Sequence, residues 1–203
     1  TDMGERKKYH RGRRKKKKGG IISTLILIIA IAVFCVSGYQ LYKIFGGYHQ
    51  GKSEYDKVRE VAVHGDDKDE DEFVVDFDEL KKINADTVGW IRFYPEPSQI
   101  SYPLVQTTDN DLYLNRTFSA NENTVGAIFV NCDNASDFSD RNTIIYGHRM
   151  RDHSMFHDLE KYKDESFWKE NPYFYIYTPD GRKLSCHIYS AGIVKDTSST
   201  YLT

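Results

Sequence analysis

The longest hydrophobic stretch of the chain lies near its N-terminus, where residues 19–42 read GGIISTLILIIAIAVFCVSGYQLY without one charged side chain. As an α-helix this stretch would extend about 36 Å, at about 1.5 Å per residue, enough to cross the hydrocarbon core of a membrane with some tilt. A cleavable signal peptide would have a shorter apolar region followed by a small-x-small site, whereas the only Ala-x-Ala triplet, residues 30–32, lies inside the stretch. The pattern therefore predicts one uncleaved transmembrane helix.

A polar segment follows this apolar stretch. Residues 43–72 mix polar and apolar side chains and end in GDDKDEDE, an acidic run at residues 65–72 that is typical of a solvated spacer. The spacing within residues 53–63 is compatible with a short helix. We therefore expect residues 43–72 to be a polar, acidic linker between the membrane and a globular domain that occupies residues 73–203.

The domain over residues 73–203 has the pattern of many short elements. Asp76, followed three residues later by Glu79, is typical of a helix N-cap, and Leu80 and Ile83 continue at helical spacing. Further short helices are expected at 109–114, from residue 154 onward and at 165–170. Apolar runs predict strands near 88–93, 100–105, 126–131, 143–146, 173–178 and 183–194. Short strands dominate, which predicts a mostly-β barrel or sandwich with peripheral short helices.

Charge is distributed unevenly along the chain. The first 18 residues hold ten Lys or Arg and two acids, which leaves 18 basic and 28 acidic residues in the remainder. A basic run directly before an apolar span is the usual topology signal and also attracts anionic lipid, so we favour it over a nucleic-acid-binding arm. We therefore expect a single-pass protein of the cell membrane, with residues 1–18 as a cytoplasmic tail and everything after residue 42 extracellular.

Cysteine and histidine suggest several alternatives for chemistry. Cys35 lies in the apolar stretch, and Cys132 with Cys186 would allow at most one disulfide. His148, His153 and His157 are close in sequence, so a metal-dependent hydrolase is one hypothesis. However, no carboxylate stands in HExxH register. We expect no metal and no cofactor, and we interpret the latter two histidines as surface residues.

Three segments together carry a more specific signal. DTVGWIRF, ISYPLVQTTDNDLYLN and NTIIYGHRMRDHSMFHDL follow one another in order between Asp76 and Thr203. They resemble the signatures of class B sortases, membrane-anchored cysteine transpeptidases of Gram-positive bacteria. The resemblance implies a β-barrel of eight antiparallel or mixed strands with extra short helices, preceded by one transmembrane helix.

The resemblance also implies a mechanism. In sortases a cysteine thiolate attacks the threonine carbonyl of a C-terminal sorting signal of LPxTG or NPxTN type on a secreted protein, giving a thioacyl enzyme. An amine of a peptidoglycan cross-bridge, a lipid-linked precursor or a pilin lysine then accepts the acyl group. His148, in YGH, matches the catalytic histidine, which serves as general acid and then as general base, while an arginine steadies the developing oxyanion.

Several other residues match positions of the family's substrate groove. They are Asn110, Leu114, Tyr146, Tyr201 and Leu202. Because Tyr and Leu often serve only in packing, these are weaker assignments than His148.

The chain also departs from the family pattern. The TLxTC motif that carries the nucleophile, and the later arginine, are not found, so we expect a truncated sequence, an incomplete barrel and no activity from this polypeptide alone. Cys186, in KLSCHIY, lacks the preceding threonine and follows His148 too closely, so we interpret it as a half-buried strand residue. An alternative function, a non-catalytic extracellular binding module on a sortase-like scaffold, stays open.

Overall fold

The computed structural model describes residues 19–66, 69 and 72–195. The chain divides into two compact units, Thr1–Lys43 and Ile44–Thr203. Helix α1 (Gly19–Ala62) is 44 residues long. Its most apolar window is long and apolar enough to cross a membrane, and none of that window is buried. The predicted apolar helix is therefore present, and it extends further than the predicted span.

The C-terminal part of α1 differs from the linker that we expected at residues 43–72. Instead of a short separate helix over residues 53–63, the helix runs unbroken to Ala62, and Tyr55, Val58 and Ala62 are buried in the core of the second unit. These three residues stand at i, i+3 and i+7, so they share one helix face. Hydrophobic burial along this face explains why the segment packs on the domain.

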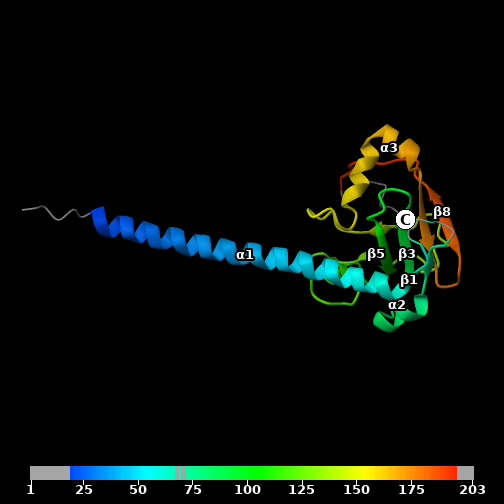
Figure 1. Ribbon diagram of the computed structural model, residues 1–203, viewed down its shortest axis with the longest axis horizontal. Coiled ribbons are helices and arrows are strands. Elements are labelled where there is room, and N and C mark those ends of the chain that lie inside the picture. Colours follow the sequence, from blue (N-terminus) through cyan, green and yellow to red (C-terminus); the bar gives the residue numbers. More distant parts are fainter. Residues whose placement is uncertain (1–18, 67–68, 70–71, 196–203) are drawn as a thin grey trace, which may run out of the picture. The chain divides into compact units, whose positions relative to one another are not determined.

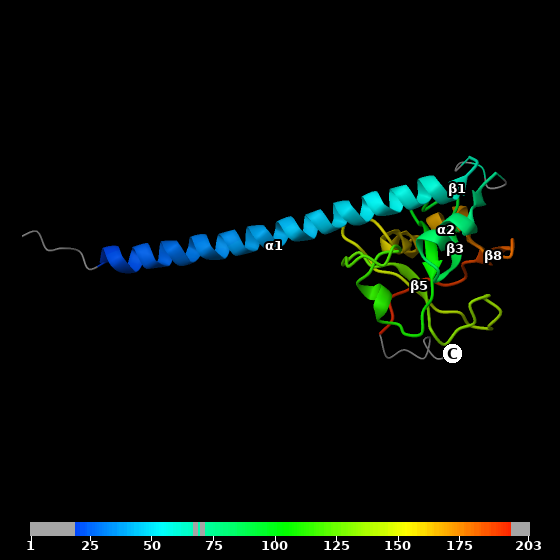
Figure 2. The ribbon, with the colours of Figure 1, turned by 90° about the horizontal axis from the view of Figure 1, so that it is seen from below.

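A two-stranded pairing and a short helix follow α1. Strand β1 (Val63–His64) pairs with β2 (Val74–Val75) in antiparallel fashion, and Figure 2 shows β1 beside the C-terminal end of α1. The acidic run lies between these strands, and its residues 67–68 and 70–71 are outside the described residues. Helix α2 (Phe77–Ile83) begins as predicted, because the Asp76 carboxylate accepts hydrogen bonds from the backbone N–H groups of Asp78 and Glu79, both at 3.0 Å.

The centre of the second unit is a six-stranded mixed sheet that curls as a half-barrel (Figure 1). Its strands are β3 (Thr87–Phe93), β4 (Ser101–Val105), β5 (Ile128–Val130), β6 (Ile145–Tyr146), β7 (Tyr173–Tyr177) and β8 (Lys183–His187). Their order is β6-β5-β4-β3-β7-β8. All neighbours are antiparallel except β4 and β5, which are parallel. The predicted mostly-β fold with peripheral short helices is confirmed.

Three more short helices complete the described fold. They are the 3₁₀ helices η1 (Leu112–Leu114) and η2 (His157–Lys163) and the α-helix α3 (Glu165–Glu170). Figure 1 shows α3 beyond one end of the strands and α2 beyond the other. The helix that we expected from residue 154 begins later because His153 and Met155 adopt positive φ angles of 65° and 56°, outside the right-handed helical region.

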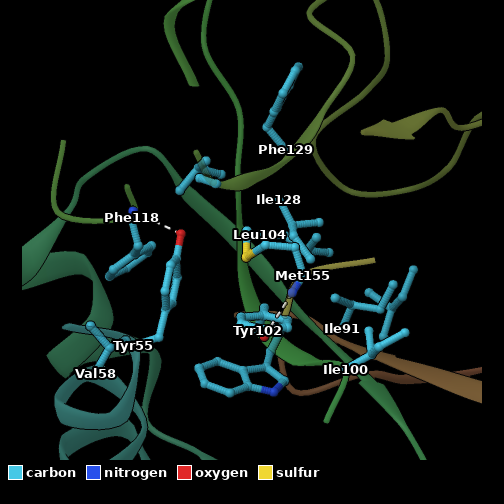
Figure 3. Close-up of a cluster of buried hydrophobic side chains, with 14 of the residues drawn as sticks. Tyr55, Val58, Ile91, Ile100, Tyr102, Leu104, Phe118, Ile128, Phe129 and Met155 are labelled. Carbon is cyan, nitrogen blue, oxygen red and sulfur yellow. Dashed lines mark hydrogen bonds between the residues drawn. The ribbon is translucent and has the colours of Figure 1, made fainter. Parts of the chain in front are cut away.

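Aromatic and aliphatic side chains from α1 and the sheet form one core (Figure 3). The rings of Tyr55 and Tyr102 meet edge to face, with centroids 5.3 Å apart. Both hydroxyls also hold loops, because Tyr55 Oη accepts from the Phe118 N–H at 3.2 Å and Tyr102 Oη accepts from the Met155 N–H at 3.1 Å. The core thereby fixes the loop that contains Phe118 and the loop that contains Met155.

Candidate active site

His148 lies two residues beyond the end of β6, and its ring is held by a backbone carbonyl. The imidazole is half-buried, and its Nε2 atom lies 2.6 Å from the carbonyl oxygen of Leu114, the last residue of η1. Because a carbonyl oxygen can only accept, Nε2 carries the proton in this arrangement. Leu114, predicted as a substrate-groove residue, therefore also positions the predicted catalytic histidine through its main chain.

Gly126 makes room for this histidine, and Gly147, the residue before it, makes room for the Phe156 ring. Gly126 has a φ of 66°, and a Cβ atom there would lie 2.8 Å from His148 Cδ2 and 2.9 Å from the Leu114 oxygen. A Cβ on Gly147 would lie 2.6 Å from the Phe156 ring. Only glycine fits such approaches without displacement. Sequence reasoning missed the role of Gly126, although a glycine opening the GAIFVN strand is the signal that could have indicated it.

The other two predicted groove residues that the structure describes lie near the ends of β5 and β6. Asn110 Oδ1 accepts a hydrogen bond of 2.9 Å from the Cys132 N–H, just after β5. The Tyr146 hydroxyl accepts one of 3.2 Å from Asn131 Nδ2, and its ring packs on Phe129 with centroids 5.1 Å apart. Their roles in substrate binding stay predictions. Tyr201 and Leu202 lie outside the described residues.

Cys186 occupies a structural position in the sheet. Cys132 and Cys186 are both free thiols. Cys186 lies in β8, at the sheet edge opposite β6, which leads to His148. Burial raises the pKa of the Cys186 thiol above its usual value, which lowers the thiolate fraction that a nucleophile needs. This position agrees with our interpretation of Cys186 as a half-buried strand residue.

The rings of the other two histidines of this segment, His153 and His157, pack against each other. His153 is exposed, whereas His157 is buried, so our interpretation of both as surface residues is wrong for His157. Their ring centroids are 4.1 Å apart. Among the described residues, the group that combines possible metal ligands is His153, His157 and Asp158. His148 is not part of this group, so the three-histidine arrangement that we considered is not formed.

Similarity to known proteins supports one family. The chain is 34% identical to sortase B of Listeria monocytogenes over 157 residues, which cover 73% of this chain and 61% of that protein. It is 30% identical to sortase B of Staphylococcus aureus over 148 residues, which cover 73% of this chain and 60% of that one. No family model matches the chain.

The fold shows the same relationship at the level of structure. The crystal structure of sortase B from Bacillus anthracis, in complex with AAEK1, matches with a TM-score of 0.63 and 32% identity, over 77% of this chain and 76% of that chain. Three features define a sortase-type protein: a half-barrel of mixed strands, a histidine in the sequence YGH close to the end of a strand, and 30–34% sequence identity to sortases B. The chain belongs to the class B sortases. It spans about 60% of the length of the two relatives from Listeria and Staphylococcus.

Proposed function

We propose that the full-length protein is a cysteine transpeptidase that joins secreted proteins to the cell wall, or pilin subunits to each other. The observation that carries this proposal is the geometry of His148 in a chain that belongs to the class B sortases: a half-buried imidazole at the end of β6, fixed by the Leu114 carbonyl. No cofactor is needed for such chemistry, because a thiolate, an imidazole and a guanidinium supply all the groups required.

His148 would transfer protons in both half-reactions. The hydrogen bond from Nε2 to the Leu114 oxygen fixes the plane of the ring, and no described residue is hydrogen-bonded to Nδ1. Nδ1 is therefore the nitrogen that would take the proton of the cysteine thiol, and the resulting imidazolium would protonate the departing amine when the cysteine is acylated. Nδ1 would then take a proton from the incoming amine when the thioester is resolved. The nucleophilic cysteine and the arginine are assigned to none of the residues described.

The substrate would be the C-terminal sorting signal of a secreted protein, of LPxTG or NPxTN type. Asn110, Leu114 and Tyr146 are proposed as one wall of the groove, with Tyr201 and Leu202 at the start of another. The acceptor would be an amine of a peptidoglycan cross-bridge, a lipid-linked precursor or a pilin lysine.

The location of the protein is part of the same proposal. Residues 19–42 would span the cell membrane once, with the basic residues 1–18 in the cytoplasm and the domain outside. The uncharged apolar part of α1 supports a span. This arrangement would place the domain where secreted substrates and cell-wall amines meet.

A fluorogenic sorting peptide tests the activity. The full-length protein should cleave an LPxTG or an NPxTN peptide and transfer the acyl group to an added amine such as triglycine. His148→Ala should abolish turnover, while His49→Ala, a change at an exposed histidine of α1, should leave it intact. Equal activity of the His148→Ala variant would overturn the role of this residue. Binding of the peptide without cleavage would instead favour the alternative, a non-catalytic module.

The 203-residue chain by itself should show no turnover in the same assay. The reason is that Cys186 is a half-buried thiol with a raised pKa, in β8 at the sheet edge opposite β6. Cleavage by this chain that disappears in the variant Cys186→Ser would contradict the expectation.

A further inference from the structure

The loop that follows His148 brings together three side chains that could bind a metal. His153, in the loop, and His157 and Asp158, in the first turn of η2, each offer one ligand atom, and these atoms all lie within 4.8 Å of one another. His153 Nδ1 is 3.4 Å from Asp158 Oδ1, within hydrogen-bonding distance, and a metal ion between the two would replace this contact. In a tetrahedral zinc site with bonds of about 2.0–2.1 Å, neighbouring ligand atoms stand roughly 3.3–3.4 Å apart. The spacing of this pair therefore suits two ligands of one zinc ion.

One ring nitrogen of His157 is unpaired among the described residues. His157 is buried, and its Nε2 atom lies 3.3 Å from Glu160 Oε1. Its Nδ1 atom is also buried and has no hydrogen-bond partner among the residues that the structure describes. A histidine with one ring nitrogen beside a carboxylate and the other nitrogen unpaired is similar to the usual arrangement of a zinc ligand with its outer partner. Because a buried unpaired nitrogen costs free energy, a metal ion at this atom would offset a cost that no described residue offsets.

Neighbouring cations orient the carboxylates of Asp158 and Glu160. Asp158 has a side chain that is 5% exposed, and Lys161 Nζ binds its Oδ2 atom at 2.8 Å, which leaves Oδ1 on the side of His153. Glu160 is oriented in turn by an ion pair between its Oε2 atom and Arg149. The side chain of His153 is 70% exposed, so an ion could enter from solvent and keep an open position for water.

In contrast to the expectation from the sequence, which was no metal, we propose that His153, His157 and Asp158 form a zinc site, with Glu160 as the outer partner of His157. Two imidazoles and one carboxylate are a ligand set that suits zinc and similar divalent transition metals rather than calcium or magnesium. The inference does not depend on the proposed transpeptidase activity, because none of these residues is assigned to that reaction.

The site would fasten the loop next to the predicted catalytic histidine. The Phe156 N–H donates to the His148 carbonyl oxygen at 2.9 Å, and Arg149 and Met155 pair as an isolated antiparallel bridge, so residues 149–155 form a closed loop. His153 sits in this loop with a φ of 65°, a conformation that costs a non-glycine residue free energy. A metal bond to His153 would offset that cost and tie the loop to η2.

Zinc binding by the full chain in detergent micelles tests the proposal. The protein is prepared without a polyhistidine tag and titrated with Zn²⁺ against a chromophoric zinc indicator at pH 7.5, and one ion per chain is expected. His153→Ala and Asp158→Asn should each weaken binding by at least about 10-fold, the loss that removal of an outer partner alone can cause. Since His153 is exposed, its variant should fold. The matched control is His49→Ala, an exposed histidine elsewhere, which should bind as the parent does.

Two further measurements distinguish this site from a zinc ion bound elsewhere on the chain. X-ray absorption of the zinc complex should show only nitrogen and oxygen ligands at about 2.0–2.1 Å. Lys161→Ala, which removes the cation that orients Asp158 through Oδ2, should weaken zinc binding, whereas a zinc ion bound elsewhere would not respond. The proposal is overturned by the absence of stoichiometric zinc, by unchanged affinity in His153→Ala, or by sulfur ligands at about 2.3 Å, which would place the ion on a cysteine.

Discussion

The hydroxyl of Tyr55, in the C-terminal part of α1, donates a hydrogen bond of 2.8 Å to the carbonyl oxygen of Gly126, 71 residues further along the chain. On its other side Gly126 faces the imidazole of His148, because a Cβ atom added there would stand 2.8 Å from His148 Cδ2. Tyr55 and the predicted catalytic histidine are therefore separated by a single glycine. This relationship makes the C-terminal part of α1 a component of the candidate site's support, not a linker.

Removal of the Tyr55 hydroxyl should destabilise the domain. In Tyr55→Phe, the buried Gly126 carbonyl and the Phe118 N–H lose the partner that serves both. We expect a loss of about 1–3 kcal/mol in the free energy of unfolding, because each buried polar group left unpaired carries its desolvation cost. Denaturant unfolding of the full chain in detergent measures it. Tyr189→Phe, at a tyrosine that is 91% exposed, should change stability by less than about 0.5 kcal/mol.

A side chain at position 126 should displace His148. Gly126→Ala combines a left-handed backbone, with φ of 66°, and close contacts to the His148 ring and the Leu114 oxygen. Gly181→Ala is the matched control, because Gly181 also has a positive φ, 84°, but a Cβ there would meet no atom of the described residues within 4 Å. The control should cost only the backbone strain, about 1 kcal/mol, and Gly126→Ala should cost more.

The position of the His148 ring reports the same change directly. NMR signals of the His148 imidazole should shift in Gly126→Ala and stay in place in Gly181→Ala. Equal stabilities of the two variants, together with unchanged imidazole signals, would show that Gly126 does not support the histidine.

Glu54 should give the domain an acid-sensitive contribution to stability. Burial raises its pKa, but hydrogen bonds from Thr117, Asn121 and Ser119 outweigh burial, so the pKa lies below the usual value of 4.5. For a carboxyl whose pKa is lower in the folded state, the stabilisation is complete above the unfolded pKa. It is lost as the pH falls through the folded pKa. Stability should therefore decrease below about pH 4.5, the usual pKa of this group.

The variant Glu54→Gln isolates this contribution. Its unfolding free energy should depend less on pH below 4.5 than that of the parent chain, because it lacks the titrating group. Glu122→Gln, at a side chain that is 87% exposed, should keep the parent's pH profile. Parallel profiles for Glu54→Gln and the parent would contradict the assignment.

Cys186 should react slowly with alkylating reagents in the folded protein. Burial raises the pKa of its thiol, so both access and the thiolate fraction are reduced. Mass spectrometry after a timed exposure to iodoacetamide at pH 7.5 measures the modified fraction. In urea, where the strand is unfolded, modification should become complete on the same time scale. Fast modification of the folded chain would show that Cys186 is more open and more reactive than its place in β8 indicates.

Much of the fold could be predicted from local sequence signals. The uncharged stretch at residues 19–42 required a long apolar helix, Asp76 fixed the start of α2, and alternating or dense apolar residues located β3, β4 and the hairpin of β7 and β8. These signals are reliable because they depend on neighbours within a few residues: a carboxylate reaching the first N–H groups of a helix, or side chains alternating between two faces of a strand. The resemblance of the YGH segment singled out His148 in the same way.

The tertiary structure alone decided the contacts between distant parts of the chain. Three contacts join residues that are far apart in sequence. They are the parallel pairing of β4 with β5, the hydrogen bond from Tyr55 to the Gly126 carbonyl, and the hydrogen bond from His148 to the Leu114 carbonyl. The proximity of His153 to His157 and Asp158 depends on the positive φ angles of His153 and Met155, which no local sequence pattern predicted. Local sequence determines which elements form, whereas burial and complementary shape determine which elements pack together. The candidate site is built from contacts between such elements, so the tertiary structure was needed to find it.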